Sequence, residues 1–238
     1  MQVRTVNYKA ADAAATLTDS LLNTGFAVLE NHPISADRLA SIYDAWGRFF
    51  ASDTKHDFLR DPVTQDGFFP FKSEHAKGAD KKDLKEFYHV YPWGKVPEEL
   101  AQENRMIYAE LMTLGIELLS WIDAEMDDDC RQSLTEPLAK MMESSEQSLL
   151  RILHYPPVDG GTESGAIRAA AHEDINLITL LVAGSKPGLQ AMDKSGQWQH
   201  ISCDAGMITI TNGDMSSLAM GSVFPSSPHR VVSPDAHL

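Results

Sequence analysis

The sequence predicts an α+β fold in which helices cover a β-sheet core. Two features support this prediction. Apolar residues recur at helical intervals up to about residue 147, whereas short β-branched segments separated by turn residues follow from about residue 148. We find no internal repeat and no low-complexity linker, so the 238 residues are expected to form a single domain. We expect its helical and mixed part over residues 1–147 and its β-rich core over residues 148–238.

The N-terminal part begins with a predicted helix, a strand and a second helix. Residues 10–23 are rich in alanine and leucine at helical spacing, and Gly25 marks the predicted end of this helix. Residues 26–29 are predicted as a short strand. Ser35 is the predicted N-cap of the next helix. The apolar stripe of that helix, which we interpret as core packing, consists of Leu39, Ile42, Trp46, Phe49 and Phe50.

The middle of the chain is predicted as a loop, a strand and two further helices. Residues 61–82 are polar and contain glycine and proline, which favours a long loop of functional importance. A strand is predicted over residues 86–91 and a long helix over residues 97–125. The acidic run Asp127-Asp128-Asp129 is expected at the solvated end of that helix, because the spacing of an EF-hand is absent. A methionine-bearing helix is predicted near residues 138–142.

Short strands dominate the predicted core. They are bounded by turn signals such as Asn212-Gly213-Asp214, and several short strands at close spacing are typical of a sandwich or barrel. We expect the helices to support one face of this core. The predicted strands are residues 149–153, 175–182, 189–191, 198–201, 207–211 and 229–232.

Composition excludes several classes of partner. The formal net charge of −14 argues against nucleic acid and against docking on an anionic membrane, because both need a basic face. Cys130 and Cys203 have no metal-type spacing, and a disulfide framework is not expected, which favours a reducing compartment. The sequence has no apolar segment of signal-peptide or membrane-spanning type, so we expect a cytoplasmic location.

The segment from Ala170 to Val182 contains the main candidate for chemistry. His172 and Asp174 are two residues apart at the start of an apolar run, and on an extended chain such residues point to the same side. An ionised carboxylate beside an apolar strand needs a partner. A metal ion, a lysine or an arginine would each serve.

A second histidine, His229, opens another β-branched segment. Together with His172 and Asp174 it makes a set of two imidazoles and one carboxylate. This set occupies one face of an octahedral ion and leaves three positions open, which suits non-haem Fe(II). The same donors also serve Zn²⁺ in hydrolases, but we find no dedicated general base beside them.

Several segments, taken in order, carry a family resemblance. Residues 25–32 (GFAVLENH) are similar to a GF…NHGI strand, residues 150–157 (LRILHYPP) to LRxNYYPP, and residues 171–181 to AHxD…ITLL. The later GLQ, GQW, NGD and PHRVV segments also match. Over nearly its whole length, the chain therefore resembles the isopenicillin N synthase-like Fe(II)/2-oxoglutarate-dependent oxygenases.

This resemblance implies a jelly-roll (double-stranded β-helix) core supported by N-terminal and central helices. It implies that His172, Asp174 and His229 bind Fe(II) and act as the catalytic centre, and that Tyr155 contacts the carboxylate of the co-substrate or the substrate. The implied activity is that of a dioxygenase using 2-oxoglutarate and O2. A ferryl species would hydroxylate, desaturate or cyclise a small organic substrate, while the oligomeric state stays open.

The chain departs from the family pattern at two points. Leu153 replaces the asparagine of the LRxNYYPP segment. The family's Arg-x-Ser, expected beyond the distal histidine, is not found before Leu238, so the last jelly-roll strand is also expected to be missing. Arg230 follows a ligand histidine and is expected to point to the opposite face, so it is no obvious substitute.

These departures keep two alternatives open. One is an oxidase like the family's namesake, which uses iron but no 2-oxoglutarate. The other is a non-catalytic jelly-roll protein that binds a metal or small ligand. Substrate choice is expected to depend on residues 61–82 and 86–91 and on the C-terminal region. Lys77, Lys85 and Arg168 are candidates for contacting an anionic substrate, although solvated surface charge is the simpler interpretation.

Overall fold

The computed structural model describes residues 2–74, 82–143, 145–157 and 167–233. Its strands are β1 (Arg4–Asn7), β2 (Phe26–Glu30), β3 (Gly67–Phe69), β4 (Glu86–Val90), β5 (Leu150–His154), β6 (Ala169–His172), β7 (Ile178–Val182), β8 (Leu189–Met192), β9 (Trp198–His200), β10 (Ile208–Asn212) and β11 (His229–Val231). Its helices are α1 (Ala13–Thr24), α2 (Ala36–Ala51), the 3₁₀ helix η1 (Asp53–Phe58), α3 (Glu98–Glu125), α4 (Asp128–Ser133), α5 (Leu138–Glu143) and α6 (Asp214–Ala219).

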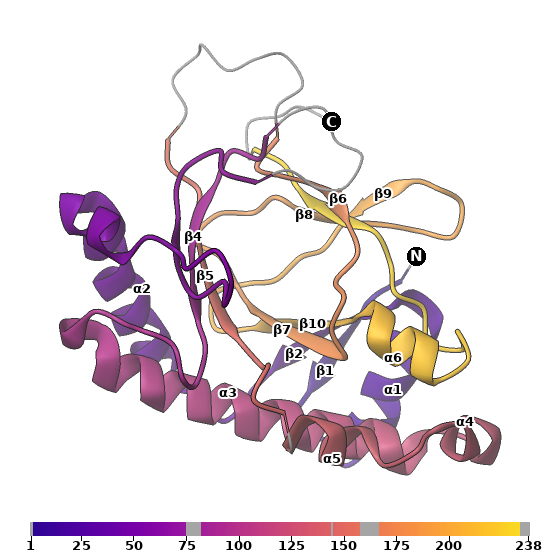
Figure 1. Ribbon diagram of the computed structural model, residues 1–238. Helices are drawn as coiled ribbons and strands as arrows, with labels where there is room; N and C mark the ends of the chain where they lie inside the picture. Colours follow the sequence, from indigo (N-terminus) through magenta and orange to yellow (C-terminus); the bar gives the residue numbers. More distant parts are fainter. Residues whose placement is uncertain (1, 75–81, 144, 158–166, 234–238) are drawn as a thin grey trace.

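The strands form a jelly-roll core, as expected. One sheet has the order β1-β2-β10-β7, a second has the order β6-β11-β8-β9, and a third has the order β3-β4-β5. The first two sheets lie on opposite sides of the core, and β4 and β5 lie between them on the side next to α2 (Figure 1). Strand β10 pairs antiparallel with both β2 and β7, so a strand from the N-terminal part lies inside a core sheet.

Helices α1 and α3 cover the outer face of the first sheet (Figure 1). Helix α3 buries Leu100, Ile107, Leu114, Leu118 and Ile122, which are spaced by three- to four-residue steps or whole heptads and so share one face. Ile208 and Ile210 of β10 belong to the same apolar cluster. Burial of this helix face against the sheet fixes the layer beneath the core.

Helix α2 covers the third sheet. Its predicted apolar stripe is buried, and Trp46 and Phe49 contact Tyr88 of β4 with ring centroids 5.0 and 5.6 Å apart. The interpretation of this stripe as core packing is therefore confirmed. Ser35 is the N-cap residue of α2, as predicted, but its side chain makes no capping hydrogen bond.

One prediction about the key segment was wrong. The expected strand over residues 175–182 begins only at Ile178, and His172 ends a separate strand, β6. Strand β6 belongs to the second sheet and β7 to the first. The chain therefore leaves one sheet and enters the other over residues 173–177, and Asp174 lies in this crossing segment.

Other parts of the chain can also be compared with the prediction. The predicted loop over residues 61–82 contains β3, and its residues 75–81 lie outside the described part. The acidic run Asp127-Asp128-Asp129 is exposed directly after α3, as expected, and Asp127 also caps α4, because its Oδ1 accepts a hydrogen bond from Cys130 N at 2.7 Å. Helix α6 was not predicted, since its start resembles a turn. Among the described helices, none combines the length and the apolar character needed to span a bilayer.

Candidate metal centre

The three predicted ligands meet at one end of the second sheet. His172 is the last residue of β6, and His229 is the first residue of β11. These strands are antiparallel, with His229 directly opposite His172, and the two rings lie 4.4 Å apart between centroids. Asp174 follows His172 by two residues. The fold thus brings together residues that are 57 positions apart in the sequence.

The donor atoms are close enough to share one ion. The Nε2 atoms of His172 and His229 each lie 3.8 Å from Asp174 Oδ1, and one ligand atom of each residue lies within 4.8 Å of the other two. Two atoms that each bind a metal at about 2.1 Å can be at most about 4.2 Å apart. Both 3.8 Å separations satisfy this limit.

Backbone carbonyl groups orient both imidazoles. His172 Nδ1 lies 2.8 Å from Ala170 O, and His229 Nδ1 lies 3.3 Å from Ser227 O. A carbonyl oxygen only accepts, so in each ring Nδ1 carries the hydrogen and Nε2 keeps a free lone pair. Both free lone pairs belong to the atoms that face Asp174 Oδ1, which is the arrangement expected of metal-binding histidines.

Two threonines hold the carboxylate of Asp174. Thr179 Oγ1 donates to Asp174 Oδ2 at 2.6 Å, and Thr211 Oγ1 donates to the same oxygen at 3.4 Å. The two threonines are cross-strand partners in β7 and β10. Asn176 Nδ2 donates to Thr179 Oγ1 at 2.8 Å. One carboxylate oxygen is therefore fixed by hydroxyl groups, while the other faces the histidines.

The surroundings of His229 favour a neutral ring. His229 is buried, and the ring of Phe26 meets it edge-on with centroids 5.8 Å apart. Burial lowers the pKa of His229, and the charge of Asp174 acts in the opposite direction. A neutral imidazole is the form that binds a metal. The donor set and its orientation thus fit a divalent ion such as Fe(II).

Tyr155 follows β5 and lies among charged groups. Burial raises the pKa of Tyr155 to about 12, and the charge of Asp83 adds to this effect, whereas Arg151 and Arg168 oppose it. The hydroxyl group therefore stays protonated at neutral pH and can donate a hydrogen bond. This environment is compatible with contact to a carboxylate ligand.

The other cations singled out in the sequence have different surroundings. The interpretation of Lys85 as a solvated charge was wrong, because it is buried and its Nζ lies 2.9 Å from Asp83 Oδ2. Arg168 is partly exposed and donates to Pro156 O at 2.5 Å. Lys77 lies outside the described residues. Arg230 donates to Gln190 Oε1 at 2.8 Å and stacks over the Trp198 ring, which occupies its guanidinium group.

Sequence reasoning missed the residues that support the ligands. Nothing in the pattern of β7 or β10 distinguishes Thr179 or Thr211 from other strand threonines, because their role depends on the pairing of the two strands. Asp214 matches a family position, and the structure gives its backbone a role. Its N–H donates to Asp174 O at 2.7 Å, so the start of α6 holds the crossing segment.

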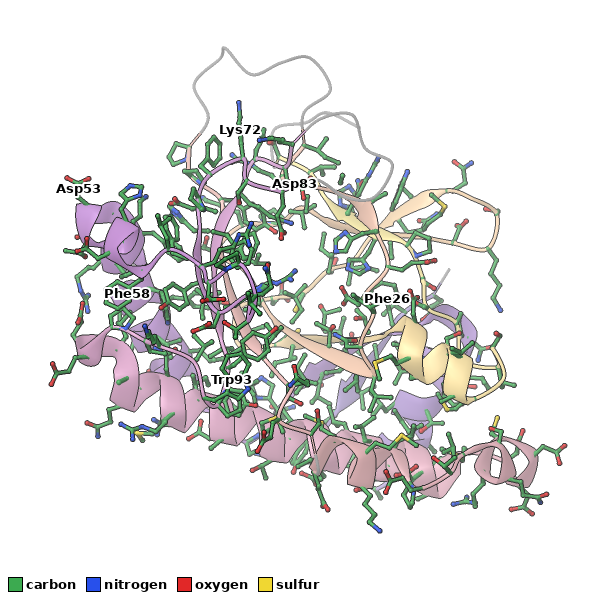
Figure 2. The ribbon with its side chains drawn as sticks, viewed as in Figure 1. Phe26, Asp53, Phe58, Lys72, Asp83 and Trp93 are labelled. Carbon is green, nitrogen blue, oxygen red and sulfur yellow. The ribbon has the colours of Figure 1, made fainter. Side chains whose placement is uncertain are left out.

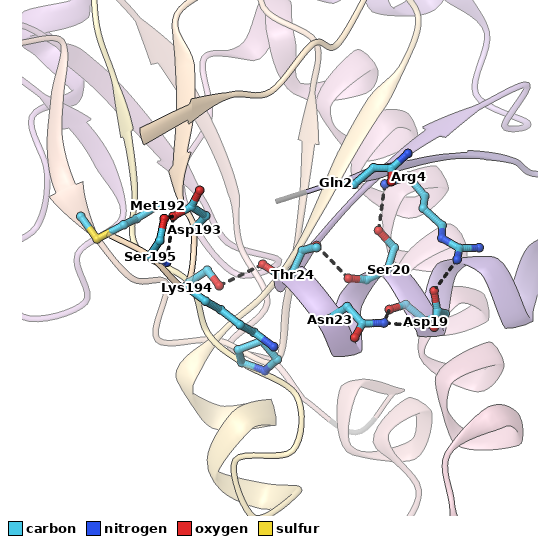
Figure 3. Close-up of a pocket in the computed structure, with 12 residues that line it drawn as sticks. Gln2, Arg4, Asp19, Ser20, Asn23, Thr24, Met192, Asp193, Lys194 and Ser195 are labelled. Atoms are coloured by element: carbon cyan, nitrogen blue, oxygen red, sulfur yellow. Dashed lines mark hydrogen bonds and ion pairs between the residues drawn. The ribbon is translucent and has the colours of Figure 1, made fainter. Parts of the chain in front are cut away.

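A separate hollow lies between the start of the chain and the β8–β9 turn (Figure 3). Three of its charged groups, Arg4, Asp19 and Asp193, already have protein partners. Arg4 pairs with Asp19 at 2.9 Å, and Asp193 Oδ1 accepts hydrogen bonds from the backbone and side chain of Ser195. None of the three candidate ligands lines this hollow. We therefore place the candidate chemistry at the His172–Asp174–His229 cluster.

Comparisons with known families match most of the chain. The family described as "non-haem dioxygenase in morphine synthesis N-terminal" matches residues 4–110. The 2OG-Fe(II) oxygenase superfamily matches residues 146–237, a range that includes all three candidate ligands and Tyr155.

Two solved structures and one related sequence support the same family. A structure described as an oxygenase from Shewanella oneidensis is 45% identical, with a TM-score of 0.90, and the match covers 100% of this chain and 85% of that one. A 2OG-Fe(II) oxygenase family protein from Caulobacter crescentus is 30% identical, with a TM-score of 0.80, and the match covers 98% and 81%. A 2-oxoglutarate-Fe(II) type oxidoreductase from Aspergillus fumigatus is 24% identical over 93% of this chain and 72% of that protein.

Proposed function

Since the chain belongs to the 2OG-Fe(II) oxygenase superfamily and is an Fe(II)- and 2-oxoglutarate-dependent dioxygenase, we propose that His172, Asp174 and His229 are its iron ligands. The observation that carries this assignment is the convergence of both histidine Nε2 atoms on Asp174 Oδ1 at 3.8 Å. Three protein ligands leave coordination positions for the co-substrate and O2.

The chain's own residues prepare this centre. When bound, Fe(II) supplies the activation of O2: 2-oxoglutarate becomes succinate and CO2 with one oxygen atom, and the second oxygen atom enters the product or leaves as water. The carbonyl groups of Ala170 and Ser227 keep the two rings in the metal-binding tautomer. Thr179 keeps the Asp174 carboxylate in a fixed orientation.

Tyr155 is the proposed contact for a carboxylate of 2-oxoglutarate. Its hydroxyl group stays protonated because burial raises its pKa to about 12, and it can therefore donate to an anion. The charges of Arg151 and Arg168 act on the same residue. Two of the three charged side chains that act on Tyr155 are thus positive, which favours an anionic co-substrate over a neutral one.

We extend the proposal to the type of substrate, the cellular location and the domain organisation. A small-molecule substrate fits the family, and the net charge of −14 does not favour nucleic acid. Cys130 and Cys203 are free thiols, and Fe(II) persists under reducing conditions, so we propose a cytoplasmic location. We also propose that residues 1–238 form one folding unit, because β2 and β4 pair with β10 and β5.

The proposal is tested by comparing wild type with His172→Ala. We expect the wild-type protein to bind Fe(II) under anaerobic conditions and, with ascorbate and O2, to form succinate from 2-oxoglutarate. His172→Ala should lose both properties, whereas the control His56→Ala, which changes an exposed histidine on η1, should keep them. Equal Fe(II) affinity and succinate formation in wild type and His172→Ala would contradict the ligand assignment. O2 uptake without succinate would favour the oxidase alternative.

A further inference from the structure

One face of the β4–β5 pair points into the barrel. Successive residues of a strand point to opposite faces, and Tyr88 of β4 contacts α2 through Trp46 and Phe49. His154 of β5 stacks on Phe50 of the same helix, with centroids 5.0 Å apart. The alternate residues of both strands therefore point away from α2, toward the interior of the core (Figure 1).

Arg151 and His89 are direct cross-strand partners on this interior face. Arg151 Nε donates to His89 Nε2 at 2.9 Å, and the Arg151 guanidinium lies 5.2 Å from the centre of the Phe87 ring. The Phe87 ring is fully buried. An arginine held at Nε and placed over an aromatic ring loses less further freedom when it binds a ligand than an unconstrained arginine.

His89 acts as a neutral acceptor for this arginine. His89 Nδ1 lies 3.0 Å from the carbonyl oxygen of Gln65, so Nδ1 carries the hydrogen and Nε2 accepts from Arg151. Burial lowers the pKa of His89 to about 4, and the charges of Arg151 and Lys85 act in the same direction. At neutral pH the imidazole therefore orients the guanidinium without adding charge.

Among the described residues, the terminal nitrogens of Arg151 have no hydrogen-bond partner. Arg151 is exposed, and within the described ranges it makes no ion pair with an acidic side chain. The neighbouring Lys85, in contrast, is paired with Asp83. The chain carries 34 acidic and 20 basic residues, so acidic partners for an arginine are abundant, and an arginine without one is not expected from the composition. Such a guanidinium presents two parallel N–H groups to a carboxylate.

The wall that carries Arg151 continues to the metal centre. Asp83, which lies just before β4 and near the upper rim of the core in Figure 2, accepts a hydrogen bond from Ala170 N at 2.9 Å. Ala170 O in turn accepts from His172 Nδ1. The charges of Asp83 and Arg151 both affect the pKa of Tyr155. Arg151 is therefore part of the same interior surface as the candidate ligands.

We propose that Arg151 binds a carboxylate group of the primary substrate, so that the enzyme oxidises a small organic acid. This inference rests on the proposed function, because it places the substrate beside the proposed iron ligands. Arg151 precedes Tyr155 by four residues, which is about 13 Å along an extended strand. If Tyr155 contacts 2-oxoglutarate, Arg151 has its own place farther along the strand, from which it can bind a second acid.

The test measures binding under anaerobic conditions to protein loaded with Fe(II) and 2-oxoglutarate. The probes are a series of aliphatic and aromatic monocarboxylic acids, each paired with its neutral primary amide. We expect at least one acid to bind while its amide does not. Arg151→Gln should weaken that binding by about 10- to 150-fold, because a charged hydrogen bond is lost. Arg151→Lys should restore part of the affinity, since it keeps the charge but not the paired N–H groups.

Two controls separate the outcomes. Arg48→Gln removes an exposed arginine on α2 and should not alter binding of the acid, and circular dichroism checks that each variant is folded. The inference is overturned if no acid binds, if acids and amides bind alike, or if Arg151→Gln binds the acid as tightly as wild type. A matching loss of 2-oxoglutarate affinity in Arg151→Gln would instead assign Arg151 to the co-substrate. Failure of the wild-type protein to load Fe(II) would count against the proposed function itself.

Discussion

Replacing Thr179 by valine tests how firmly the Asp174 carboxylate must be held to bind iron. Thr179 Oγ1 donates to Asp174 Oδ2 at 2.6 Å, and a hydrogen bond to a charged group contributes about 1.5–3 kcal/mol. Valine suits a β-strand, so β7 should form as before. Among the described residues, the Asp174 carboxylate would keep only the longer hydrogen bond from Thr211, at 3.4 Å. We expect Fe(II) affinity to fall by about 10- to 100-fold, the range typical for groups that orient metal ligands.

The assay is an anaerobic Fe(II) titration against a competing chelator, with thermal unfolding of the metal-free protein measured in parallel. Thr18→Val provides the control, because Thr18 is a buried threonine on α1 whose hydroxyl group has no partner among the described residues. This control should leave Fe(II) affinity within about twofold, since it removes no bond to a ligand. An unchanged Fe(II) affinity in Thr179→Val would refute the reasoning that this hydroxyl group orients the carboxylate.

Three further predictions concern stability and local geometry. The pKa of His89 falls from 6.5 to about 4 on folding, so between these pH values the unfolded chain binds a proton that the folded chain does not. The contribution of His89 to the unfolding free energy should therefore be complete above about pH 6.5 and decrease by about 3 kcal/mol toward pH 4, as measured by urea unfolding. His89→Gln should flatten this dependence, whereas His56→Gln should not. Glu86→Ala should lower the unfolding free energy by about 3 kcal/mol, because the buried Glu86 binds both Lys55 and His154, and Glu86→Gln should lose less. Gly213→Ala should weaken Fe(II) binding, because the added Cβ would overlap the carbonyl oxygen of Asn176, close to Asp174. The control Gly47→Ala adds a Cβ that has no atoms nearby, so it should raise the unfolding free energy by about 0.5–1 kcal/mol.

The proposed ligand set could be predicted because its signal is local. The two-residue spacing of His172 and Asp174 places both side chains on one side, and this held even though the strand ends between them. His229 was found from the β-branched segment that it opens, which is β11. The aromatic stripe of α2 was equally clear, because helical periodicity alone separates its buried face from its exposed face.

Features that depend on strand pairing could not be predicted. The break between β6 and β7 follows from their membership of different sheets, and the apolar pattern continues across it. Thr179 meets Thr211, and His89 meets Arg151, only because the registers of two strand pairs place them opposite each other. Lys85 and Asp83 are only two residues apart, so their pairing could have been predicted; their burial could not, because it depends on tertiary contacts such as the hydrogen bond from Ala170 N to Asp83.

The end of α1 touches the ligand region directly. Gly25 adopts a left-handed conformation with φ of 75°, and any Cβ there would collide with Ser227 Oγ and Pro225 O. Ser227 Oγ donates to Thr24 O, and Ser227 O accepts from His229 Nδ1. If His229 binds iron as proposed, iron occupancy and the order of the end of α1 are coupled in both directions, since a ligand that binds only the ordered state stabilises it. Loading the metal should slow amide hydrogen exchange in α1 and β2, and disordering these N-terminal elements should release iron.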